Sequence, residues 1–139
     1  MEAKELRIGN IIAIEGTYCT VNSIHLVPQT DEVHIRVSGY IENNPQHCIF
    51  NYDASPIPLT PALLEKCGFI RTVTPMQSVN YIDYRKGNMV CFTLPDGLVE
   101  VEYSGLGIEK RAYLTKIKYL HQLQNLYFAL TGEELEVNL

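Results

Sequence analysis

The sequence predicts an α+β domain, built mainly from antiparallel sheet, with a short central helix and a C-terminal helix. Short segments rich in β-branched and aromatic residues alternate with turn residues along most of the chain, and two segments carry helix start and stop signals. With 139 residues and 46% apolar content, the chain is long enough to bury one core. We therefore expect a single domain over residues 1–139, with residues 1–55 and 56–139 as two sub-parts of it.

Four short strands are predicted in the N-terminal part, and an SH3-like small barrel is the packing that this pattern suggests. The predicted strands cover residues 11–14, 18–26, 33–38 and 47–52. The second and third strands should form a hairpin in which Ile24 opposes Ile35 and Leu26 opposes Val33, because this register gives one apolar face.

A short helix is predicted over residues 61–67, directly after a proline-rich link. Thr60 can cap its first turn, and Pro61 suits the first helical position. Gly68 can adopt the left-handed conformation that commonly follows a helix. These start and stop signals agree with one another, so both ends of this helix are predicted.

A three-stranded meander is predicted next, over residues 79–84, 89–94 and 98–103. The Asp96-Gly97 pair is a strong signal for a two-residue hairpin turn. That turn sets Leu94 against Val99 and Phe92 against Val101. Tyr81 and Tyr103 are expected in the core beside them, whereas several of the nine tyrosines remain free to anchor an interface.

The final helix, predicted over residues 118–131, has no formally charged residue between Tyr119 and Gly132. Its apolar stripe consists of Leu120, Leu123, Tyr127 and Leu130. The opposite face consists of His121, Gln122, Asn125 and Phe128. Because solvent normally permits charge on an outer face, we predict that another surface covers this one. The N-terminal sheet, a second copy of the chain and a foreign partner all remain open as that surface.

No metal site, cofactor site or catalytic signature is predicted. The four cysteines contain no Cys-x-x-Cys pair, so neither a zinc ribbon nor a thioredoxin-like motif is encoded. His25 and His34 oppose each other in the predicted hairpin, but two ligands do not make a site, and we expect them to point outward without a metal. An enzyme is therefore the less favoured class.

The net charge of −5 disfavours nucleic acid as a partner. A local exception is a basic cluster that could form a modest phosphate-binding patch, although such a cluster is more typical of a solvated face. Its members are Lys110, Arg111, Lys116 and Lys118. No apolar run is long enough to cross a bilayer, and the first residues lack the features of a signal peptide, so we expect a cytoplasmic protein without membrane contact.

Three segments carry a resemblance to a known family. They read ELRIGN at residues 5–10, PIPLT at residues 56–60 with CGF at 67–69, and HQLQNLYFALTGEEL at residues 121–135. On these segments the chain resembles a family of small uncharacterised proteins of gut Bacteroidetes and of their phages and integrated elements. The resemblance implies a bacterial or phage-related accessory role and supplies no activity, cofactor or catalytic residue.

These observations favour a non-catalytic protein-interaction or accessory module, with a protein partner or a homo-oligomer as its binding mode. The first alternative is a nucleic-acid-associated accessory protein that uses the basic cluster. The second alternative is a small hydrolase whose site is not visible in residue spacing.

Overall fold

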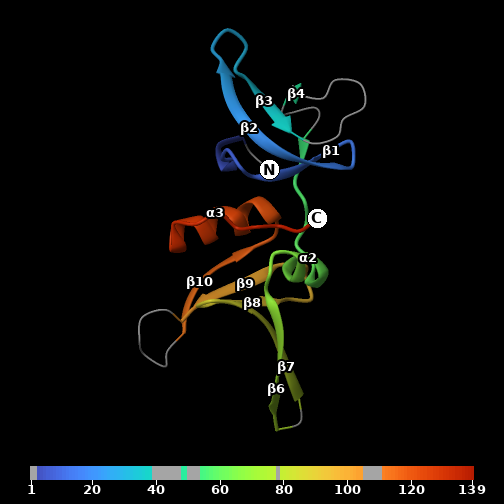
Figure 1. The fold of residues 1–139 in the computed structure, drawn as a ribbon, viewed down its shortest axis with the longest axis vertical. Helices are drawn as coiled ribbons and strands as arrows, with labels where there is room; N and C mark the ends of the chain where they lie inside the picture. The colour runs from blue at the N-terminus through green and yellow to red at the C-terminus, as the bar shows by residue number, and fades with distance from the viewer. Residues whose placement is uncertain (1–2, 39–47, 50–53, 78, 105–110) are drawn as a thin grey trace. The chain divides into compact units, whose positions relative to one another are not determined.

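The computed structural model describes residues 3–38, 48–49, 54–77, 79–104 and 111–139 (Figure 1). It confirms the α+β class, with two five-stranded antiparallel sheets, a short central helix and a C-terminal helix. The chain divides into two compact units: unit 1 comprises Met1–Pro58 with Tyr119–Glu134, and unit 2 comprises Leu59–Lys118 with Leu135–Leu139. The C-terminal helix thus belongs to the same unit as the N-terminal strands. None of the described helices has the length and apolar character needed to span a bilayer.

Unit 1 is an open sheet with strand order β4-β3-β2-β1-β5, not the predicted SH3-like barrel. Among the described residues its outermost strands, β4 and β5, do not pair with each other, so the sheet is not closed. Of the predicted strand at residues 47–52, Cys48 and Ile49 form β4, and residues 47 and 50–52 lie outside the described residues. The elements of unit 1 are the 3-10 turn η1 (Ala3–Glu5), β1 (Ile11–Ile14), β2 (Thr17–Val27), β3 (Glu32–Ser38), β4 (Cys48–Ile49), β5 (Ala54–Ser55) and α3 (Leu120–Thr131).

The predicted β2–β3 register is confirmed, since Ile24 opposes Ile35 and Leu26 opposes Val33. Only the half of this hairpin nearest β1 is buried, because Ile35 is fully covered whereas Leu26 is 64% exposed. The core of the sheet consists of Ile12, Ile14, Cys19, Val21, Ile35 and Val37.

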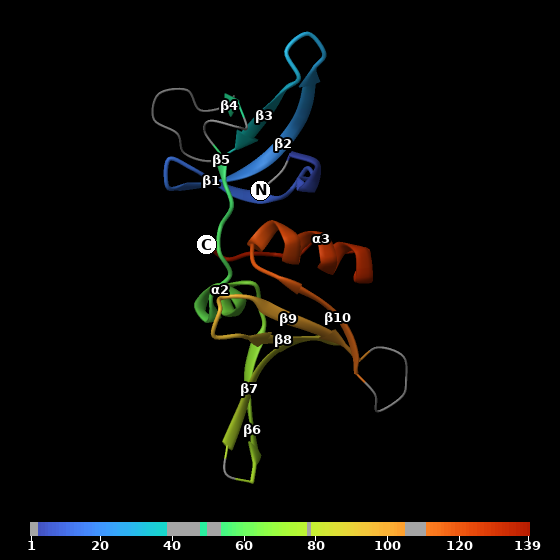
Figure 2. The same cartoon turned by 180° about the vertical axis from the view of Figure 1, so that it is seen from behind.

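Unit 2 contains a sheet with strand order β10-β9-β8-β7-β6 (Figure 2). The predicted three-stranded meander therefore gains a strand at each edge. Pro75 weakened the sequence signal of β6, and proline is tolerated there because an edge strand leaves some N–H positions unpaired. The elements of unit 2 are α2 (Pro61–Lys66), β6 (Ile70–Met76), β7 (Val79–Lys86), β8 (Met89–Thr93), β9 (Val99–Tyr103) and β10 (Ala112–Ile117).

The central helix is confirmed together with both of its end signals. The Thr60 hydroxyl accepts a hydrogen bond from the Leu63 N–H at 3.1 Å. Gly68 has a φ of +80°, and the Phe69 N–H then donates to the Leu64 carbonyl at 3.1 Å. This reversal buries Phe69 against the helix end, as a left-handed glycine after a helix allows.

The predicted register between β8 and β9 is wrong by one residue, because Phe92 opposes Glu100 rather than Val101. The cause is the turn. The Leu94 N–H donates to the Leu98 carbonyl at 2.8 Å, so the loop holds three residues, with Pro95 included and Gly97 at a φ of +81°. A one-residue slip moves side chains to the opposite face. Phe92 consequently leaves the core.

The prediction that Tyr81 lies in the core is also wrong, since its side chain is 54% exposed. Tyr84 takes the buried place, opposite the buried Cys91. Because side chains alternate between the faces of a strand, two residues three positions apart cannot share one face.

Candidate functional site

The face of α3 that we predicted to be covered lies against the chain segment between η1 and β1 in unit 1. His121 is completely buried, and the Gln122 side chain accepts a hydrogen bond from the Tyr119 N–H at the start of the helix, at 3.2 Å. Asn125 accepts a hydrogen bond from Arg7, and the Phe128 ring lies against the Arg7 guanidinium. The structure therefore places all four predicted interface residues in contacts within one unit.

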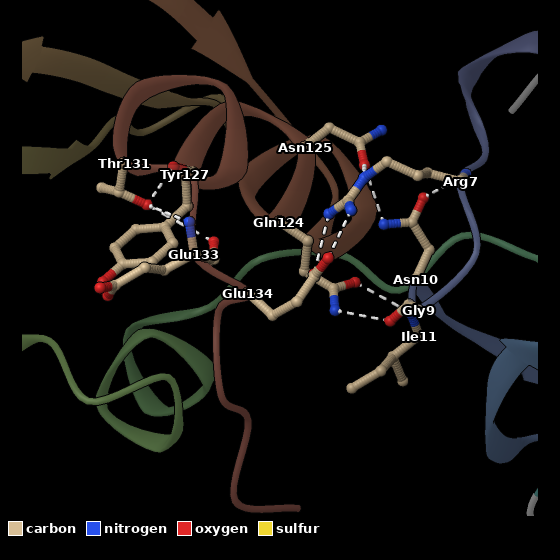
Figure 3. A network of polar contacts seen from close by, with 10 residues as sticks. All are labelled: Arg7, Gly9, Asn10, Ile11, Gln124, Asn125, Tyr127, Thr131, Glu133 and Glu134. Carbon is tan, nitrogen blue, oxygen red and sulfur yellow. Dashed lines mark hydrogen bonds and ion pairs between the residues drawn. The ribbon is translucent and has the colours of Figure 1, made fainter.

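Asn125 stands at the centre of a polar network (Figure 3). Its side-chain oxygen accepts hydrogen bonds from Asn10 Nδ2 at 2.9 Å and from Arg7 Nε at 3.2 Å. Its side-chain nitrogen donates to the Glu5 carbonyl at 2.7 Å. Asn10 is fully buried, so the loss of Asn125 would leave a buried donor without its partner.

Arg7 links the two ends of this network. Its guanidinium binds the Glu134 carboxylate in a bidentate manner, at 2.6 and 2.9 Å. The same group lies 4.2 Å from the centre of the Phe128 ring, within the range of a cation–π contact. The hydrogen bonds from Arg7 lower the pKa of Glu134, so this carboxylate stays ionised over the physiological range.

Gln124 is a further member of the network that the sequence analysis did not identify. Its side-chain oxygen accepts from the Ile11 N–H at 2.9 Å, and its side-chain nitrogen donates to the Gly9 carbonyl at 3.2 Å. Gln124 is nearly fully buried. The Gln124 amide thus bonds to the backbone of Gly9 and Ile11 as a neighbouring strand would. The only indication of this role in the sequence was the absence of charged residues along the helix.

His121 is buried with an unusual set of neighbours. Its Nε2 lies 3.4 Å from a carboxylate oxygen of Glu5, and its ring stacks on Tyr119 with centroids 5.9 Å apart. Nδ1 has no hydrogen-bond partner among the described residues. Burial lowers the pKa of His121, although the Glu5 carboxylate acts in the opposite direction. The imidazole is therefore neutral in the folded protein at neutral pH.

We expect this histidine to make folding pH-dependent. Because the pKa of His121 is lower in the folded protein than in the unfolded chain, its contribution to stability is complete above about pH 6.5 and is lost as the pH falls through the folded pKa. Urea midpoints for the wild type and for His121→Gln, measured between pH 5 and 7.5, should converge towards low pH. The variant Gln29→Leu, at an exposed site with no titratable group, should remain parallel to the wild type, and parallel curves for His121→Gln would contradict this assignment.

The network joins the first and last of the three segments on which the family resemblance rests. No family model, curated protein or solved structure matches the chain. The resemblance therefore remains an expectation, and the functional argument depends on the geometry of the chain itself.

The predicted phosphate patch is partly neutralised by carboxylates. Arg111 Nη1 lies 3.9 Å from Glu102, and Lys116 Nζ lies 3.9 Å from Glu100. Lys118 lies just after β10 on the exposed surface, and Lys110 lies outside the described residues. Two carboxylates beside two of the cations weaken the positive potential that a phosphate would need.

The two histidines of the hairpin oppose each other as predicted. His34 Nε2 lies 3.3 Å from the Glu32 carboxylate, and His25 is exposed. Across the part of the chain that the structure describes, no three His, Cys, Asp or Glu side chains gather as metal ligands.

Cys19, Cys67 and Cys91 are free and buried, which disfavours them as nucleophiles. Burial raises the pKa of Cys67 to about 11, with Lys86 acting against it, and raises the pKa of Cys91 to about 12. Burial also raises the pKa of Cys19. Since the thiolate is the reactive form, these thiols are unreactive at neutral pH.

A cleft of about 560 Å³ opens in unit 2, where the far part of β7 leaves β8. Pairing between these strands ends at Tyr84 and Cys91, although both strands continue beyond that point. Figures 1 and 2 both show the β6–β7 hairpin diverging from β8. We call this space the β7–β8 cleft. It is lined by Asn80, Tyr81, Ile82, Phe92, Thr93, Leu94, Glu100 and Glu102.

The lining of the β7–β8 cleft combines an aromatic pair with two carboxylates. The rings of Tyr81 and Phe92 meet edge to face, with centroids 6.2 Å apart. Glu100 and Glu102 lie 3.9 Å from their cationic neighbours, which is too long for a hydrogen bond. Their carboxylate oxygens therefore retain hydrogen-bonding capacity for a ligand.

Proposed function

We propose that the protein is a non-catalytic protein-interaction module with an accessory role in bacteria or their phages, acting in the cytoplasm, and that it binds its partner through the β7–β8 cleft and the adjoining β6–β7 hairpin. The observation that carries this proposal is the exposure of apolar side chains on the hairpin. Val73, Tyr81 and Ile82 are 44%, 54% and 41% exposed.

These exposed side chains occupy both faces of the hairpin. Val73 and Ile82 oppose each other across β6 and β7, so they form one apolar patch. Tyr81 lies on the other face, beside Phe92. Aromatic and aliphatic groups beside polar groups such as Glu100 are typical of a protein-binding surface.

The alternatives have less support. Nucleic acid binding would need the basic cluster, whose Arg111 and Lys116 lie beside carboxylates. A hydrolase with a cysteine nucleophile would need a thiolate, and burial raises the pKa of Cys19, Cys67 and Cys91. A second copy of the chain remains a candidate partner, because the proposal specifies the surface and not the identity of the protein that binds it.

Affinity capture with matched variants tests the proposal. We expect Tyr81→Ser combined with Ile82→Ser to reduce capture of a specific partner at least about tenfold, as loss of central interface side chains does. Leu26→Ser, which removes an exposed leucine from unit 1, should leave capture unchanged. The capture uses lysate from the encoding organism and is repeated with the purified partner. A thermal melt of each variant checks that it is folded. Equal capture by both variants, or capture of no specific protein and no self-association, would contradict the proposal.

A further inference from the structure

We infer that the β7–β8 cleft accepts an extended segment of a partner protein as an added strand, with a lysine or arginine side chain of that segment directed towards Glu100 and Glu102. This inference deepens the proposed function and rests on it. It names the binding mode and the chemistry of the bound segment. All of the residues that form the cleft lie in unit 2.

The backbone of β8 presents unpaired groups to the cleft. The Leu94 N–H bonds to Leu98 and the Ser104 N–H bonds to Asn88, so these residues form hydrogen-bonded pairs between β8 and β9 and their flanks. Backbone groups of successive residues in a strand point to opposite sides. Cys91 and Thr93 therefore direct their N–H and C=O groups away from β9 and towards β7, where Cys91 pairs with Tyr84 and Thr93 has no strand partner.

The backbone of β7 presents the matching groups from the other side. Tyr84 opposes Cys91 and Lys86 opposes Met89, and these pairs use the backbone groups that β8 directs towards β7. By the same alternation, Asn80 and Ile82 also direct their backbone groups towards β8. The next pair in this register would be Ile82 with Thr93, and it is not formed.

Proline prevents the two strands from pairing beyond Ile82 and Thr93. In the same register Asn80 would oppose Pro95, which has no N–H to donate. The three-residue loop that contains Pro95 also turns the chain towards β9 at this point. Two short backbone edges consequently face one another across the cleft, and an extended peptide satisfies such edges by strand addition.

The side chains that line the cleft indicate a basic segment. Glu100 and Glu102 place two carboxylates in the cleft, each 3.9 Å from a cation of the neighbouring segment and thus beyond hydrogen-bond distance, and the chain as a whole carries a net charge of −5. A lysine or arginine can lay its aliphatic stem against Tyr81 and Phe92 while its charged end reaches a carboxylate. The net charge of −5 disfavours nucleic acid, so the proposed occupant is a protein segment.

A peptide titration tests the inference on the full chain. The probe is a fluorescently labelled six-residue peptide of alternating valine and threonine with one central lysine. Its binding is measured by fluorescence anisotropy at physiological salt. We expect binding that weakens at least about tenfold when alternate backbone nitrogens are methylated, since methylation removes the strand-forming donors. Exchange of the central lysine for glutamate should weaken binding at least about fivefold. A single-stranded oligonucleotide should not bind.

Variants of the protein complete this test. Glu100→Gln with Glu102→Gln should weaken peptide binding about fivefold, whereas Glu133→Gln with Glu136→Gln, the same change of charge elsewhere, should not. Absence of binding up to millimolar peptide, insensitivity to methylation, or equal loss in both double variants would overturn the inference. If capture of a partner still depends on Tyr81 and Ile82 in that case, the proposed function stands and only strand addition fails.

Discussion

Asn125→Lys is expected to lower the free energy of unfolding by about 2–4 kcal/mol. The change removes the acceptor of the buried Asn10 amide and the donor to the Glu5 carbonyl. It also places an ammonium group beside the Arg7 guanidinium, whose Nε loses the amide oxygen to which it donates in the wild type. Urea denaturation of the purified chain measures the effect.

A matched control for this variant is Gln29→Lys, in the exposed turn between β2 and β3. It makes the same kind of change, from an amide to an ammonium, and should alter stability by less than about 0.5 kcal/mol. If Asn125→Lys is equally neutral, the α3 face is ordinary surface. If it leaves stability intact but weakens self-association or partner capture, that face is an interface between chains.

Gln124→Leu is expected to destabilise the protein by a similar amount, about 2–4 kcal/mol, with no change of charge. Leucine has nearly the same volume but leaves the Ile11 N–H and the Gly9 carbonyl without the partners that they have in the wild type. An apolar residue on an exposed helix face would instead be nearly neutral. The measurement is again the urea midpoint, with the slope of the transition checked for two-state behaviour.

The control for Gln124→Leu is Gln29→Leu, the same substitution at an exposed site. We expect it to change stability by less than about 0.5 kcal/mol. A Gln124→Leu protein as stable as the wild type would show that the helix does not depend on its bonds to the segment before β1.

Local signals were sufficient for several parts of the fold. The Thr60 cap and the left-handed Gly68 both act within a few residues of α2, so its ends could be predicted from the sequence. The β2–β3 register was also predictable, because only one register aligns the apolar residues of the two strands.

The β8–β9 register could not be predicted from its turn signal alone. An Asp-Gly pair supports a two-residue loop, but the preceding Pro95 lies within the loop and extends it to three residues. That one residue decides whether Phe92 or Cys91 enters the core. The β7–β8 cleft depends on the same register. The sequence therefore could not predict that Glu100 and Glu102 lie beside the Tyr81 and Phe92 rings in one cleft.

The α3 face illustrates what composition can and cannot predict. The absence of charge indicated that something covers the helix, and residues before β1 do so in unit 1. The covering residue could not be identified, because Arg7 and Glu134 are 127 residues apart in the chain. No local spacing rule connects positions so distant, and only the folded chain brings them together.

Amide hydrogen exchange at Ile82 tests whether the β7–β8 cleft contains an open backbone edge. In the free protein the Ile82 amide should exchange at least about tenfold faster than the Tyr84 amide, which lies in the paired part of β7. Addition of the lysine-containing peptide should slow exchange at Ile82 and Thr93 and leave Tyr84 unchanged. Exchange at Ile82 as slow as at Tyr84 in the free protein, or unaltered by saturating peptide, would contradict the account.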